Sequence, residues 1–448
     1  MKRLQYILAI VALSLMLTVP AFAAPKVALP QRDTWDADMV DSNITGYTGK
    51  GVYIAVLDTG LVPYWRDYFP VARIATHLGK GFVENVHVDP QTGELVYSGY
   101  VHETSWVGES LSTHGTHVSS TIIGYNYYAP SDWLGGFPLA PLFVKGIAPD
   151  AIIIPVKVLS DYVFPGYWEG KNIQFGTDKA VAAGIYYATE LKIQGYSPMV
   201  ISMSLGGPEP TVEIEDAINY AIANGVIVVA SAGNEGDAGM GWPGAYPQVI
   251  SVGACGWKYE WYWPNALPHA PRFRLWWLQD NTYGYRDIPE PTPATDVYIT
   301  DFSSRPNATL GQQLEDLDIV APGSWVRGPM PGSGDGYARL PWWSNGLGWY
   351  YSTPGLTNFF YVGGTSMSAP HVSAVAAQML EKNPTLTQAK VETIMKTTAL
   401  PIPAATDYEY YDIVNATGHS APGWYYLTWG VDAVGSGLIQ AGAAVAAS

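Results

Sequence analysis

The stretch VYIAVLDTG, at residues 52–60, opens with six consecutive apolar or aromatic residues and closes on an aspartate and a turn glycine. Further runs that are largely apolar follow at 152–159, 200–205, 226–230 and 249–253. Continuous apolarity, in place of alternation, is typical of strands buried on both faces, as in a parallel sheet. The stretch therefore predicts a buried strand of a parallel sheet, with Asp58 at its carboxyl end.

Helical patterns separate these runs. One covers residues 177–194, and another covers 213–224 and is followed by Gly225, a common residue just past a helix end. The alternation of strand and helix predicts a doubly wound α/β domain. Ligands of such sheets gather at the carboxyl ends of the strands, where three polar residues are expected: Asp58, Ser204 and Asn234.

The composition excludes several classes of protein. Of the 448 residues, 48% are hydrophobic and only 14% are charged, so the chain can form a large core and is not intrinsically disordered. Its single cysteine, Cys255, excludes a disulfide scaffold. Lys and Arg number 23 against 39 Asp and Glu, and the net charge of −16 argues against duplex nucleic acid as a partner and disfavours acidic substrates slightly.

The N-terminus has the features of a secretory signal peptide. Two basic residues precede a mostly apolar run at 6–19, and Ala21-Phe22-Ala23 follows as a cleavage site. We expect a signal peptide at 1–23 and export to the extracellular space; an uncleaved anchor is the alternative. Downstream of residue 23 no stretch has the roughly 18 apolar residues of a membrane span, so none is expected after cleavage.

Three segments interrupt the alternating pattern, at about 80–112, 256–300 and 324–364. The last two are rich in aromatic residues, which argues against flexible linkers because linkers lack side chains worth burying. We expect one domain over residues 24–448, in which the three segments are loop insertions. Three roles of these insertions stay open: extension of a binding cleft, binding of a polymer, or only coverage of the core.

Four segments carry residues suited to chemistry, at 55–60, 114–118, 231–236 and 364–372. Asp58 is expected in a fixed position at the end of a strand. His114 opens a helical stretch, and the ordinary pKa of histidine near 6.5 suits proton transfer at neutral pH. Asn234 follows a buried strand, where its amide could donate a hydrogen bond to an oxyanion.

Ser366 lies in a Gly-Thr-Ser turn before a helix of small residues, expected from Ser368 to about Lys382. A serine there lies at the positive end of the helix dipole, near free N–H groups. Pro370 is expected in the first turn of this helix, where its missing N–H does least harm.

The order of these residues in the chain is Asp, His, Ser, which among the familiar catalytic triads is the order of the subtilisins. All four segments resemble the motifs of the subtilisin-like serine proteases, the subtilases. So do the segments at 146–149, 204–207 and 321–323. The resemblance extends from about residue 34 to 444, apart from the insertions, and implies a subtilisin-like three-layer α/β fold with a mostly parallel central sheet flanked by helices.

The resemblance also implies the catalytic roles. Ser366 would be the nucleophile, His114 the general base and then acid, and Asp58 the residue that orients His114. Asn234 and the Ser366 N–H would form the oxyanion hole. The resemblance further implies substrate-binding residues, which pair with the substrate backbone or form the pocket for the residue before the cleaved bond: Ser204, Leu205, Gly206, Ala232, Gly233 and Gly241. Because glycine at 233 and 241 leaves space, we expect a large apolar or aromatic residue in this pocket.

No catalytic metal is implied. His117 and His371 are interpreted as packed structural residues, and the remaining histidines lack the spacing of a zinc site. Many subtilases bind structural Ca²⁺, so such a site is open here, with ligands that the sequence does not name. The N-terminal acidic residues are interpreted as a solvated segment: Asp33, Asp36, Asp38 and Asp41.

The sequence thus predicts an exported serine endopeptidase that acts on protein or peptide substrates through an acyl-enzyme. The residues before Asp58 resemble the start of the catalytic domain, so no recognisable inhibitory propeptide is expected. Two alternatives stay open: a catalytically silent binding or cell-surface protein on a subtilase fold, and a subtilase that ligates or cyclises peptides.

Overall fold

A computed structural model describes residues 29–108, 112–127, 141–163, 172–258, 288–331, 343–344, 358–412 and 423–448. The chain divides into two units, residues 1–30 and 31–448, and every helix and strand of the described ranges belongs to the second. The expected signal peptide at 1–23 lies outside the described residues, as do large parts of the expected insertions at 256–300 and 324–364.

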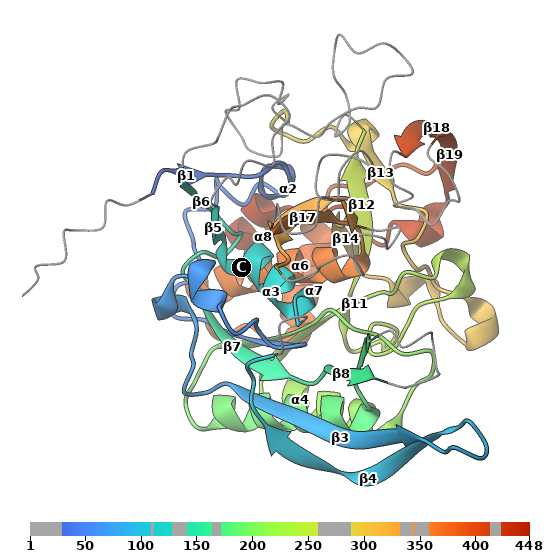
Figure 1. The fold of residues 1–448 in the computed structure, drawn as a ribbon. Helices are drawn as coiled ribbons and strands as arrows, with labels where there is room; N and C mark the ends of the chain where they lie inside the picture. The colour runs from blue at the N-terminus through green and yellow to red at the C-terminus, as the bar shows by residue number, and fades with distance from the viewer. Residues whose placement is uncertain are drawn as a thin grey trace, which may run out of the picture. The chain divides into compact units, whose positions relative to one another are not determined.

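A nine-stranded sheet forms the centre of this unit (Figure 1). Its order is β13-β12-β11-β10-β2-β7-β3-β4, with β14 also paired to β12. The strands are β2 (Tyr53–Asp58), β3 (Lys80–Val88), β4 (Leu95–Thr104), β7 (Ile152–Lys157), β10 (Met199–Met203), β11 (Ile227–Ser231), β12 (Ile250–Trp257), β13 (Val297–Ile299) and β14 (Ile319–Pro322).

Most of these strands run parallel, as the continuous apolar runs predict. β2 lies between β10 and β7 and is parallel to both, with Ala55 opposite Ile201 on one side and Ile154 on the other. In the described part of this sheet, β13 and β4 alone pair in antiparallel fashion, each beside one end of the parallel set. The predicted α/β fold with a mostly parallel sheet is confirmed.

Helices cover both faces of the sheet, and alternate side chains of β2 reach the two cores that result. Ile54 and Val56 pack in the core that also holds residues of α3 (His114–Ile123) and α6 (Thr365–Lys382). Ala55 and Leu57 pack in the other core, with residues of α4 (Asp178–Ile193) and α5 (Val212–Ala223). The Thr177 side chain caps α4 by accepting a hydrogen bond from Ala180 N, so this helix begins where the sequence predicted.

Shorter elements surround this framework. In the described ranges the remaining α-helices are α2 (Trp35–Met39), α7 (Gln388–Thr398) and α8 (Ala441–Ala447). The remaining strands form small sheets: β1 (Gln31–Arg32) with β6 (Leu142–Val144) and β5 (Tyr125–Tyr127); β15 (Val326–Pro329) with β17 (Phe359–Val362) and β16 (Trp343–Ser344); β18 (Ala405–Asp412) with β19 (Gly423–Trp429); and β8 (Ser160–Val163) with β9 (Asn172–Phe175).

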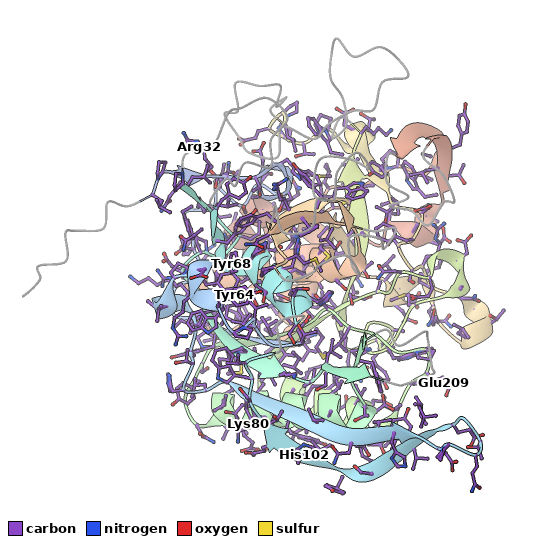
Figure 2. The ribbon with its side chains drawn as sticks, viewed as in Figure 1. Arg32, Tyr64, Tyr68, Lys80, His102 and Glu209 are labelled. Atoms are coloured by element: carbon purple, nitrogen blue, oxygen red, sulfur yellow. The ribbon has the colours of Figure 1, made fainter. Side chains whose placement is uncertain are left out.

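The expected insertion at 80–112 is largely a hairpin that extends the main sheet. β3 pairs with β7 through Lys80 and Gly81 and then continues as a hairpin with β4. Figure 2 shows Lys80 and His102 on the two strands of this hairpin. β4 is mostly exposed along its length, so the hairpin lengthens the sheet while covering little of the core.

The acidic N-terminal segment is not solvated, in contrast to the expectation from its sequence. Asp36 and Asp38 are only 5% and 2% exposed. Asp36 Oδ2 lies 3.1 Å from Nε2 of the buried His371 on α6, and Asp38 Oδ2 accepts a hydrogen bond from Ile288 N. The segment is buried because its carboxylates meet hydrogen-bond donors from distant parts of the chain, which no local pattern shows.

None of the helices in the described part of the chain combines the length and apolar character needed to cross a membrane.

Candidate active site

Asp58 is the last residue of β2 and is fully buried. The N–H of Thr59 donates to its Oδ1 at 2.6 Å. The Thr59 hydroxyl in turn accepts a hydrogen bond from Gly115 N at 3.0 Å, which ties the strand end to the first turn of α3. At Gly115 a Cβ would lie 2.5 Å from Gly60 O, so glycine permits this close approach.

His114 is the first residue of α3, and its Nδ1 lies 2.9 Å from both carboxylate oxygens of Asp58. Burial alone would lower the pKa of His114. The negative charge of Asp58 and its hydrogen bond act in the opposite direction, and the net result is a pKa raised above 6.5. The predicted partnership of Asp58 and His114 is therefore present in the structure.

Ser366 is the second residue of α6, which begins one residue before it. This differs from the expected helix start at Ser368, and it places Pro370 in the second turn instead of the first. The helix begins early because Gly364, at φ 156°, turns the chain so that Met367 N donates to Gly364 O. The Ser366 hydroxyl therefore lies at the helix N-terminus, as the sequence predicted.

The Ser366 hydroxyl contacts the neighbouring strand end. Its Oγ donates to Ser204 O over 3.4 Å, and the Ser204 hydroxyl donates to Ser366 O at 2.7 Å. In the described part of the chain, no hydrogen bond joins Ser366 Oγ to His114. Catalytic hydrogen bonds are often long or misaligned in free enzymes, and rotation about χ1 redirects the hydroxyl.

Asn234 lies beside the start of α6. Its Oδ1 accepts hydrogen bonds from Thr365 N at 2.8 Å and from Thr365 Oγ1 at 3.0 Å. Because the Thr365 N–H can only donate, the amide oxygen must face it, and the amide Nδ2 is left to donate elsewhere. This arrangement fixes the orientation of the only side-chain donor that was predicted for the oxyanion hole.

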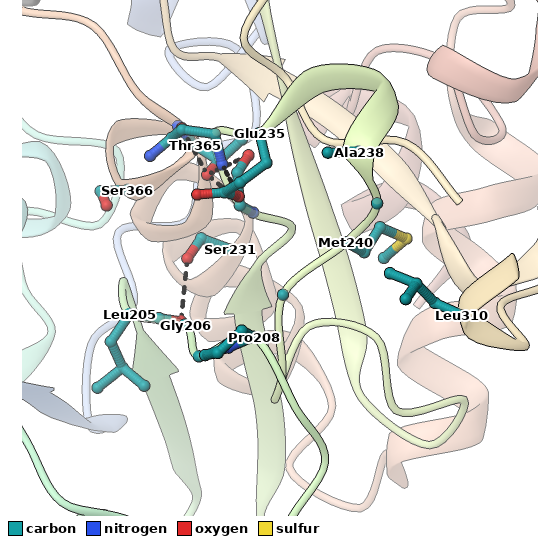
Figure 3. A pocket seen from close by; sticks show the side chains of 15 residues that line it. Leu205, Gly206, Pro208, Ser231, Glu235, Ala238, Met240, Leu310, Thr365 and Ser366 are labelled. Atoms are coloured by element: carbon teal, nitrogen blue, oxygen red, sulfur yellow. Dashed lines mark hydrogen bonds between the residues drawn. The ribbon is translucent and has the colours of Figure 1, made fainter. Parts of the chain in front are cut away.

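A cavity of about 390 Å³ opens beside Ser366 (Figure 3). Gly233 and Gly241 line it, as expected, and so do Leu205 and Gly206. Ala232 does not: it is fully buried behind the cavity, in a small cluster with Met240, Ala245 and Leu317. Its side chain therefore points into the core, and the place of Ala232 in the pocket wall stays a prediction.

Nine of the fifteen residues that line this cavity were not predicted as site residues, and three of the nine bear on its chemistry. They are Glu235, Met240 and Leu310, and Figure 3 shows Met240 and Leu310 at the opposite end of the cavity from Ser366. Glu235 directly follows Asn234, so its position was a usable signal. Leu310 comes from a short helix far away in the sequence, and nothing local indicates that it returns to the cleft.

A second cavity, of about 300 Å³, lies on the other side of the segment at residues 205–207. His114, Ser204 and Trp242 are among its lining residues, and Leu205, Gly206 and Gly207 line both cavities. The segment predicted to pair with a substrate backbone therefore lies between two pockets, with Ser366 beside one and His114 beside the other.

The two flanking histidines are buried, as predicted for packed structural residues. His117 Nε2 lies 3.2 Å from Val326 O, and burial lowers the pKa of this histidine to about 3. His371 contacts Met367 O and Asp36. Within the described ranges, no group of three or more His, Cys, Asp or Glu side chains is arranged to hold a metal ion.

A buried aspartate that orients a histidine, with a serine and a fixed amide at a helix N-terminus, is the layout of serine hydrolases of Asp–His–Ser order. Residues 49–421 match the subtilase family, peptidase family S8. The chain belongs to this family.

The individual relatives have low sequence identity to this chain, but several of the matches cover most of it. Subtilisin E of Bacillus subtilis (strain 168) is 26% identical over 358 residues, covering 79% of this chain and 62% of that protein. Subtilisin BL of Lederbergia lenta is 27% identical over 372 residues, covering 83% and 91%. An intracellular serine protease of Paenibacillus polymyxa is 34% identical over 212 residues, covering 46% and 50%. The chain thus spans less than two thirds of the length of two of these three relatives.

Solved structures agree on the fold. Sphericase superposes with a TM-score of 0.53 at 25% identity, over 91% of this chain and 97% of sphericase. The S41 psychrophilic protease gives 0.53 at 22% identity, over 92% and 99%.

We predict that His114 titrates above pH 6.5 and that Asp58→Asn lowers its pKa, because the raising charge is removed while burial is retained. The measurement is NMR of the imidazole in a Ser366→Ala background, with Asp89→Asn as a control carboxylate in the hairpin turn. Since only neutral imidazole accepts a proton, phosphonate labelling of Ser366 in the wild type should slow as the pH falls through this pKa. Titration of His114 at or below 6.5 with Asp58 intact would contradict the assignment.

Proposed function

We propose that the protein is a serine endopeptidase that hydrolyses peptide bonds through an acyl-enzyme. The observation that carries this proposal is the Asp58–His114 pair, whose two contacts of 2.9 Å hold the imidazole at the second cavity. That cavity shares the segment 205–207 with the cavity that contains Ser366. Ser366 Oγ would attack the scissile carbonyl while His114 takes its proton. His114 would then give that proton to the leaving amine, and a water molecule would release the acyl group by the same steps.

The tetrahedral intermediates place a negative charge on the former carbonyl oxygen. We propose that the Asn234 amide and the Ser366 N–H donate to it. Thr365 supports this role because its N–H and hydroxyl hold the amide oxygen and so leave Nδ2 to face the reaction. Donors that are already oriented stabilise the developing charge without a reorganisation cost. No step in this scheme requires a cofactor.

The substrate would add as a strand along Ser204, Leu205 and Gly206. Successive side chains of a strand point to opposite sides. The residue before the cleaved bond would then enter the cavity beside Ser366, and its neighbour would enter the cavity beside His114. Gly233 and Gly241 leave room in the first cavity, while Met240 and Leu310 provide apolar surface at its far end.

The central test uses an active-site phosphonate and unfolded casein. The wild-type protein should incorporate the label at Ser366 and cleave casein, whereas Ser366→Ala should do neither, because no other nucleophile completes the acyl transfer. Failure of the wild type to label or to cleave would instead support a silent binding protein. Product masses distinguish the third candidate, since ligated peptides in place of hydrolysed ones would indicate transpeptidation.

Cleavage preference can be predicted from the first cavity. We expect cleavage after large apolar or aromatic residues and little cleavage after Asp or Glu, because the Glu235 carboxylate lines the cavity and no Lys or Arg of the described residues does. Digestion of a peptide library, analysed by mass spectrometry, measures this. Glu235→Gln should raise cleavage after Glu by about fivefold, the size of one partly screened charge repulsion.

Glu209→Gln is the matched control for this experiment, because Glu209 lines only the second cavity. Equal cleavage by the wild type after acidic and apolar residues would refute the proposed preference.

We also propose that residues 1–23 direct export and are removed. The support is the sequence alone: the basic start, the apolar run and the Ala21-Phe22-Ala23 site. N-terminal sequencing of protein recovered from the culture medium should begin at Ala24. Retention of the product inside the cells, or a membrane-bound product with Met1 intact, would overturn this proposal.

A further inference from the structure

Helix α6 lacks one of its backbone hydrogen bonds at the position of the nucleophile. In an α-helix the carbonyl of each residue accepts from the N–H four residues later. The residue four positions after Ser366 is Pro370, which has no N–H and whose ring also pushes that carbonyl outward. The Ser366 carbonyl therefore needs a donor from outside the helix.

The donor is the hydroxyl of Ser204. Its Oγ lies 2.7 Å from Ser366 O, a normal length for a bond between a hydroxyl and a carbonyl. Ser204 is 3% exposed, so few water molecules compete for its hydroxyl. Ser366 Oγ makes the longer return contact of 3.4 Å to Ser204 O. The two serines thus form a reciprocal pair that joins the start of α6 to the end of β10.

We infer that Ser204 is a positioning residue whose side chain fixes the main chain of the nucleophile. A bond to the Ser366 carbonyl sets the peptide plane on one side of Ser366 and therefore restricts where Oγ and N–H lie. Both groups take part in the reaction under the proposed function, on which this inference rests. The role differs from that of the Ser204 backbone, which was predicted to pair with the substrate.

A double-mutant cycle between Ser204 and Pro370 tests this inference. Ser204→Ala should lower kcat by between about threefold and tenfold, the range of one neutral hydrogen bond, with KM unchanged within twofold. Ser204→Thr, which keeps a hydroxyl, should recover most of the loss. In a Pro370→Ala background the helix regains an N–H for the Ser366 carbonyl, so Ser204→Ala should then cost less than twofold.

Ser373→Ala is the matched control. The Ser373 hydroxyl links the same two elements further along the helix: it donates to Ala369 O at 3.0 Å, and its Oγ lies 2.8 Å from Ser202 Oγ. It does not touch the Ser366 carbonyl, so its effect should be the same with Pro370 and with Ala at that position. Equal losses from Ser204→Ala in both backgrounds, or a loss confined to KM, would overturn the inference.

A second measurement separates this inference from the proposed function. In a Ser366→Ala background, which keeps the main-chain carbonyl, the urea midpoint of unfolding reports the same bond without catalysis. Ser204→Ala should lower the midpoint with Pro370 present and lower it less after Pro370→Ala. If the wild type neither labels nor cleaves, the proposed function fails, while this cycle still supports or refutes the contact.

Discussion

The burial of α6 against the central sheet is the constraint on which the rest of the structure depends. Fifteen of its 18 residues are buried, and small side chains such as Ala369, Ser373 and Ala376 dominate the helix. Small side chains allow close packing, and closely packed interiors do not shift freely. The N-terminal segment adds a further restraint, because Asp36 contacts His371 of the same helix. Ser366 is therefore carried by one of the most firmly held elements of the protein.

The parallel sheet brings the other site residues to the same edge. β11, β10 and β2 are neighbours and run in the same direction. Their carboxyl ends accordingly lie side by side, and from them extend Asn234, Ser204 and Asp58. Asp58 and Asn234, the two most distant of these residues, are 176 positions apart in the sequence. The register of the sheet sets their spacing in the folded protein. Each of these residues lies within a few positions of its strand end, so the loops contribute little to where it is placed.

The sequence was informative wherever a feature depends on nearby residues or on a long apolar pattern. The five buried strands, α4 with its Thr177 cap, and the Asp58–His114 pair all belong to this group. The sequence was uninformative where residues far apart in the chain determine the burial or the position of a side chain. The burial of Asp36 depends on His371, the position of Leu310 depends on the path of a remote loop, and Ala232 faces the core because of its neighbours in a small cluster. The early start of α6 was missed because Thr365 and Ser366 were interpreted as part of a turn.

His114 and His117 show how strongly position determines chemistry on one helix. They are three residues apart on α3, yet the pKa of His114 is raised and that of His117 is lowered to about 3. Asp58 stabilises the protonated form of the first, whereas burial without a carboxylate contact destabilises the protonated form of the second. The difference has a functional consequence, because a second positive charge one turn away would repel the imidazolium that forms on His114 during the reaction. A neutral His117 leaves Asp58 as the charge that acts on His114, so the same burial that packs α3 also protects its proton-transfer chemistry.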